Sequence, residues 1–128
     1  MIQLPYQTDI YPPAPALDIE VTLPTDSDWH GPFSALVDTG ADMTVIPEYL
    51  LARLRFPSSR VAYLSTQWDQ SPQMHIVQAD IRVVGLIFPG VDIALDPEGD
   101  EIVLGRNLLN YLDIRLQGPK QRLHILNA

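Results

Sequence analysis

The feature that most restricts the fold of this chain is its proline content. Twelve prolines stand against seven glycines in 128 residues, and they are spread from Pro5 to Pro119. A proline ring fixes its own backbone angle and removes an N–H donor, so it interrupts helices and the central strands of sheets. We therefore expect short elements that are separated by many turns.

Apolar residues recur with the two-residue period of a β-strand. Leu17, Ile19, Val21 and Leu23 alternate with polar residues and predict a strand with one buried face. Further strands are predicted at residues 33–37, 43–46, 61–64, 74–84, 86–88, 91–95, 102–104, 113–116 and 122–126, and short helices at 47–54 and 107–111. The predicted fold class is mostly β, a barrel-like sheet with one or two short helices.

The first of these helices is expected to begin at Pro47, because the missing N–H of proline costs nothing at the first helical position. Tyr49, Leu50 and Leu54 would then face inward, with Leu51 as a further candidate.

Length and charge limit the organisation and the partners of the chain. We expect residues 1–16 to form an extended N-terminal arm and residues 17–128 to form a single domain. The formal net charge of −8 disfavours binding to nucleic acid or to an anionic membrane surface. The absence of cysteine excludes disulfides, thiol nucleophiles and Cys-based metal sites. No apolar run could span a bilayer and residues 1–11 do not form a secretory signal, so we expect a cytoplasmic protein.

The segment from Ser34 to Ile46 carries the most chemical information. One apolar run delivers Asp38 to a turn, and a second apolar run leaves it. Gly40 allows a sharp turn and a close backbone approach to a ligand, and Thr39 places a hydroxyl beside the acid. On these residues alone, Asp38-Thr39-Gly40 can also be read as an ordinary β-turn.

With Ala41, this segment resembles the catalytic loop of the retropepsin-like aspartic proteases. A second stretch, Ile102 to Leu109, resembles the apolar-apolar-Gly-Arg-Asn-Leu-Leu run that opens the C-terminal helix of that family, at a fitting distance along the chain. The resemblance covers residues 17–113 and implies a retropepsin-like acid protease barrel. It also implies a pair between Asp42 and Arg106 that is more structural than chemical.

The resemblance implies an aspartic endopeptidase with Asp38 as its catalytic residue. Because two carboxylates must act on one water and no second Asp-Thr-Gly or Asp-Ser-Gly occurs, we expect a two-fold homodimer that contributes one Asp38 from each subunit. Thr39 and Gly40 would support the loop. Gly40, Ala41 and Asp42 would hold a peptide or protein substrate as an extended strand, and no metal or other cofactor is expected.

The chain departs from retroviral members in the stretch from 63 to 74, which contains no glycine where a flap tip is expected. Trp68 is a candidate flap contact with substrate, and packing in the core is an equal alternative. The chain begins with its own Met1, which favours a stand-alone cellular or bacterial member of the family over a retroviral one. The alternative function is a non-catalytic peptide-binding or dimerisation module with the same fold.

Other polar residues do not form a recognisable site. His30, His75 and His124 lack the spacing of metal ligands. The acids between residues 96 and 101 lack the spacing of a calcium loop, so we interpret them as a solvated turn.

Overall fold

A computed structural model describes residues 1–63 and 73–128 of the chain. Its elements, in chain order, are β1 (Ile2–Pro5), β2 (Ala16–Thr22), β3 (His30–Val37), β4 (Thr44–Pro47), the 3₁₀ helix η1 (Glu48–Leu51), β5 (Arg60–Tyr63), β6 (Gln73–Val83), β7 (Leu86–Asp96), β8 (Ile102–Leu104), α1 (Arg106–Leu109), β9 (Ile114–Gln117), η2 (Gly118–Lys120) and β10 (Arg122–Ile125). The prediction of a mostly β chain with short helices is confirmed.

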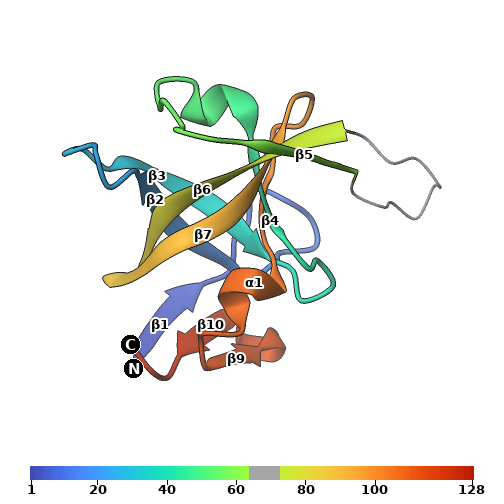
Figure 1. Cartoon of the computed structure of the whole chain (residues 1–128). Coiled ribbons are helices and arrows are strands. Elements are labelled where there is room, and N and C mark those ends of the chain that lie inside the picture. The colour runs from blue at the N-terminus through green and yellow to red at the C-terminus, as the bar shows by residue number, and fades with distance from the viewer. Residues whose placement is uncertain (64–72) are drawn as a thin grey trace.

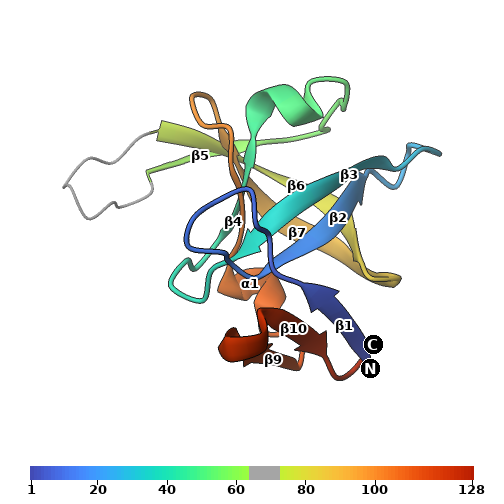
Figure 2. The same ribbon diagram turned by 180° about the vertical axis from the view of Figure 1, so that it is seen from behind.

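Six of the strands close into a barrel. Their order is β2-β3-β8-β4-β7-β6, and an additional β2–β6 pairing joins the two ends (Figures 1 and 2). β5 continues the sheet beyond β6. β6 and β7 form a long hairpin, and its turn places Val84 and Gly85 at φ angles of 46° and 84°. Closure leaves most barrel strands without a free edge.

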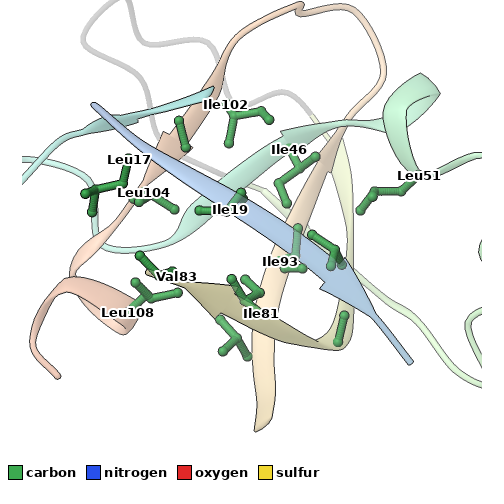
Figure 3. Close-up of a cluster of buried hydrophobic side chains, with 14 of the residues drawn as sticks. Leu17, Ile19, Ile46, Leu51, Ile81, Val83, Ile93, Ile102, Leu104 and Leu108 are labelled. Carbon is green, nitrogen blue, oxygen red and sulfur yellow. The ribbon is translucent and has the colours of Figure 1, made fainter. Parts of the chain in front are cut away.

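The barrel encloses one apolar core. The alternation of β2 is confirmed, because Leu17, Ile19 and Val21 are all at most 1% exposed. Side chains from β4, β6, β7, β8 and α1 meet them (Figure 3). Burial of this apolar surface is the main force that holds the barrel closed.

The N-terminal segment is not a separate arm. β1 pairs antiparallel with β10, and β10 pairs with β9, to give a three-stranded sheet beside the barrel. Leu4 and Tyr6 also pack against the core. The polar, proline-broken composition of residues 1–16 predicted an extended conformation but gave no sign of a partner more than 100 residues away in sequence.

Two local predictions are wrong. Helix η1 has four residues instead of the expected eight, and Tyr49 is 63% exposed, because so short a helix buries only part of its circumference. Residues 86–96 form one strand instead of two, since Pro89 and Gly90 lie within β7. Gly90 takes a φ of 63° there, and its N–H donates to the Asp80 carboxylate at 3.0 Å.

Candidate active site

The Asp38 loop crosses the end of a central strand. β8 lies between β3, to which it is parallel, and β4, to which it is antiparallel. The connection at residues 38–43 therefore passes over the carboxyl end of β8, where α1 begins. This crossing is what brings the two separate sequence motifs together in space.

Backbone hydrogen bonds fix the loop to β8 and α1. The Asp38 N–H donates to the Leu104 carbonyl at 3.1 Å, and the Arg106 N–H donates to the Ala41 carbonyl at 2.8 Å. The Arg106 guanidinium adds a bond of 2.7 Å from Nη1 to the Thr39 carbonyl. The loop is thus tied to the second motif on both sides of Gly40.

The Asp38 carboxylate lies at the surface of the single chain. Asp38, Thr39 and Gly40 are all exposed. The Gly40 N–H donates to Asp38 Oδ1 at 2.9 Å, and it is the one donor to this carboxylate among the described residues. A Cβ added at Gly40 would lie only 3.1 Å from the same oxygen, so glycine allows the loop to close this tightly around its acid.

Beneath the loop, one asparagine links three elements. Asn107 Oδ1 accepts hydrogen bonds from the Thr44 N–H at 3.0 Å and from the Thr44 hydroxyl at 2.9 Å. Its Nδ2 donates to the Asp92 carbonyl at 2.8 Å. The Thr44 oxygen in turn accepts the Gly105 N–H at 3.2 Å. We call these four residues the buttress, because they join β4, β7 and the start of α1 directly behind residues 38–43.

The buttress requires a very close backbone contact. A Cβ added at Gly105 would lie 2.4 to 2.7 Å from the backbone C, O and N atoms of Met43. Backbone atoms cannot rotate away as a flexible side chain could. Gly105 is therefore needed so that α1 can begin against the end of the Asp38 loop.

The carboxylate of Asp92 extends the buttress outward. Oδ2 accepts from Arg60 at 3.0 Å, and Oδ1 accepts from Gln78 at 3.1 Å. Burial raises the pKa of Asp92, but the hydrogen bonds from Arg60 and Gln78 and the charge of Arg60 outweigh it and hold that pKa below its ordinary value. Asp92 is thus ionised at neutral pH and braces the strand that Asn107 contacts.

Other predicted site residues have different outcomes. The expected pair between Asp42 and Arg106 does not form in the single chain: the guanidinium contacts the Thr39 carbonyl instead, and Asp42 is exposed. Ala41 is half-buried. Trp68 lies outside the described residues.

Sequence reasoning missed the role of Thr44 and Asn107. One signal was available, because Thr44 is a polar residue in an apolar strand and is fully buried. A buried hydroxyl needs a hydrogen-bond partner, and the polar residue that follows Gly-Arg in the second motif was a candidate.

Two further kinds of feature are absent from residues 1–63 and 73–128. In this part of the chain, no three His, Asp or Glu side chains come together as a metal-binding group. Within the same residues, no helix combines the length and apolar character needed to cross a membrane.

Comparison with known proteins places this site in context. Residues 29–111 match the model of a family described as "gag-polyprotein putative aspartyl protease", and this range includes both motifs. The fold is similar to the crystal structure of a retropepsin-like aspartic protease from Rickettsia conorii, with a TM-score of 0.67, 17% sequence identity and coverage of 97% of this chain and 88% of that one. No curated protein matches the chain significantly.

Proposed function

The chain belongs to the gag-polyprotein aspartyl protease family, and on this premise we propose that it is an aspartic endopeptidase whose catalytic carboxylate is Asp38. The observation that carries the proposal is the placement of this acid. Asp38 is exposed, and it sits on a loop that is fixed by hydrogen bonds to both β8 and α1. An acid that is accessible and yet held by a rigid support is what general acid–base chemistry requires.

The chemistry needs two carboxylates around one water. An ionised carboxylate takes a proton from the water, whose oxygen then attacks the carbonyl carbon of the peptide bond. A second carboxyl group, still protonated, donates its proton to the carbonyl oxygen. When the tetrahedral intermediate collapses, a proton passes to the amide nitrogen and the C–N bond breaks. Two carboxyl groups at about 3 Å share one proton, because both cannot ionise cheaply at that distance.

A second copy of the chain would supply the second carboxylate. The sequence has one Asp-Thr-Gly and no Asp-Ser-Gly, so the partner's loop is the source we propose. A two-fold axis beside Asp38 would bring identical loops together, with the Thr39 hydroxyls bracing them across the axis. The exposure of residues 38–40 in the single chain supports this arrangement, because these residues are free to meet a partner.

Substrate would bind as an extended strand along the same loop. Gly40, Ala41 and Asp42 offer backbone groups to such a segment, and Trp68 is proposed as a further contact with substrate. Main-chain hydrogen bonds of this kind select an extended conformation more strongly than a particular side chain. An endopeptidase with cleavage preferences set by neighbouring side chains is the activity we propose.

The alternative is a non-catalytic module of the same fold that binds peptides or mediates dimerisation. The observation that favours it is the stretch from residue 63 to 74, which has no glycine to form a mobile tip over the substrate. A crystal grown with a hydroxyl-bearing transition-state mimic would separate the two functions. The hydroxyl should lie between two Asp38 carboxylates in an enzyme, whereas a pure binder would leave that position empty or blocked.

The direct test is cleavage of a diverse peptide mixture, followed by mass spectrometry from about pH 4 to pH 7. Asp38→Asn keeps the size of the side chain and removes its acid chemistry, so it is the matched control. Cuts made by the native chain and absent from the control would support the proposed activity. No cuts at any pH from folded, dimeric protein would instead favour the binding module.

A further inference from the structure

The sheet β1-β10-β9 concentrates positive charge on an otherwise acidic chain. Its strand register places Arg115, Arg122 and His124 on one face, because paired residues share a face and every second residue along a strand returns to it. The opposite face carries Leu123 and Ile125, both 0% exposed. The sheet lies beside α1 at one end of the molecule, apart from the barrel strands (Figure 1). We call the face with the two arginines the outer face.

Charge is segregated onto this part of the chain. Arg115, Lys120 and Arg122 are exposed, and they make up three of the eight Lys and Arg residues. Asp113 is the one acid in residues 113–128, whereas residues 1–112 hold five cationic and fifteen acidic side chains. A positive surface on so acidic a chain is complementary to an anionic partner.

The three cations have no carboxylate within ion-pair distance among the described residues. Arg60 and Arg82, by contrast, form ion pairs at 3.0 and 2.9 Å. Arg115 and Arg122 are diagonal neighbours on β9 and β10. The backbones of such neighbours lie about 7–8 Å apart, so their long side chains can interact. Two like charges at this spacing repel, so an anion bound between them would be favourable.

A buried histidine lies in the middle of the outer face. His124 is 6% exposed, and its Nε2–H donates to Gln117 Oε1 at 2.8 Å. Its other ring nitrogen, Nδ1, is buried and has no partner in the described part of the chain. The hydrogen-bonding capacity of Nδ1 is therefore unused in the described part of the chain. Buried polar atoms without partners are rare in folded proteins.

We propose that the outer face of the β1-β10-β9 sheet is a docking surface for an acidic segment of another polypeptide. Such a segment offers carboxylates to Arg115 and Arg122, which are exposed on this face. A nucleic acid fits less well, because a long polyanion would extend from three cations onto a strongly acidic surface. This inference does not depend on protease activity.

The test measures binding of a short, fluorescein-labelled tetra-glutamate peptide to the full chain by anisotropy at about 50 mM salt, where surface electrostatics are weakly screened. The native chain should bind saturably. The double variant Arg115→Gln/Arg122→Gln should weaken binding about tenfold. The matched double variant Arg53→Gln/Arg55→Gln removes the same charge at exposed positions elsewhere and should leave binding unchanged.

Several results would overturn the proposal. Equal weakening in both double variants would mean that the peptide responds to net charge and not to this face. Tighter binding of a single-stranded oligonucleotide of equal charge would assign the face to a different class of partner. A loss of self-association in Arg115→Gln/Arg122→Gln, with no change in peptide binding, would identify the partner as a second copy of the chain. Absence of peptide binding at low salt would also refute it.

Discussion

Replacing Asn107 by alanine would remove the side chain that joins β4, β7 and the start of α1 behind the Asp38 loop. Three hydrogen bonds end on this side chain, two from Thr44 and one to the Asp92 carbonyl. Each contributes about 1 kcal/mol net, and a buried group left without a partner costs about 1–3 kcal/mol. Thr44 is 0% exposed, whereas Asn107 is half-buried, so water replaces only part of what the truncation removes.

We therefore expect Asn107→Ala to lower the free energy of unfolding by about 2–4 kcal/mol. Domains of this size unfold with about 5–15 kcal/mol, so the loss would be a large share of the total. The loop would also shift at temperatures where the variant stays folded. A displacement of about 1 Å at a catalytic group can cost about 100-fold in rate, so kcat/KM should fall together with stability.

Urea unfolding followed by far-UV circular dichroism measures the first effect. It should be repeated at several protein concentrations, because association raises apparent stability. Asn110→Ala is the matched control: Asn110 is exposed, and its side chain forms no hydrogen bond with the described residues. Its change should stay within about 0.5 kcal/mol.

A double-mutant cycle isolates the hydrogen bond between the Thr44 hydroxyl and Asn107 from the other contacts of the two residues. Thr44→Val removes a hydroxyl that makes two hydrogen bonds. This hydroxyl donates to Asn107 Oδ1, and its oxygen accepts the Gly105 N–H. The double variant should be about 1 kcal/mol more stable than the sum of the single changes predicts, because both remove one common interaction. The reasoning is refuted if Asn107→Ala unfolds at the same urea concentration as Asn110→Ala.

Two further predictions concern the same region. Gly105→Ala places a Cβ within 2.7 Å of the Met43 backbone and should destabilise the chain by about 1–3 kcal/mol or more. Gly118→Ala is the control, because no atom lies within 4 Å of its added Cβ, and it should be close to neutral in the same urea assay. Equal effects of the two substitutions would contradict the close contact at Gly105. Arg60→Gln should lower stability at neutral pH. The folded-state pKa of Asp92 lies below its ordinary value of 3.8, so the stabilisation is present above that value and is lost as pH falls through the folded pKa. Urea midpoints of native and variant chains should thus differ at pH 7 and converge once the pH falls below the folded-state pKa of Asp92, and a difference that is constant with pH would contradict this assignment.

Local sequence patterns predicted the parts of the fold that depend on neighbours in the chain. The period-two alternation of β2 was sufficient to identify its buried face, because sheet geometry alone determines which residues point inward. The pairing of β1 with β10 was not predictable in this way. It depends on residues more than 100 positions apart, and a polar, proline-rich segment does not specify its partner.

In the candidate site, too, some contacts were predictable from the sequence and others depend on how distant segments meet in space. The meeting of Asp38 with the Arg106 segment was predicted from a resemblance, and the structure gives it a physical form in the loop that crosses β8. The contact of the guanidinium with a carbonyl, in place of Asp42, follows from backbone geometry that composition does not encode. The buttress likewise depends on three elements, β4, β7 and α1, that meet in space.

The central claim is that two Asp38 carboxylates from two copies of the chain act on one water. Mixing native chain with increasing amounts of Asp38→Asn, at constant total concentration and with time for subunit exchange, tests it directly once a cleaved peptide is in hand. If each active site needs both acids, cleavage should follow the square of the native fraction, so an equal mixture keeps about a quarter of the activity. Activity in proportion to the native fraction, about half in the same mixture, would show that one chain acts alone and would contradict the shared site.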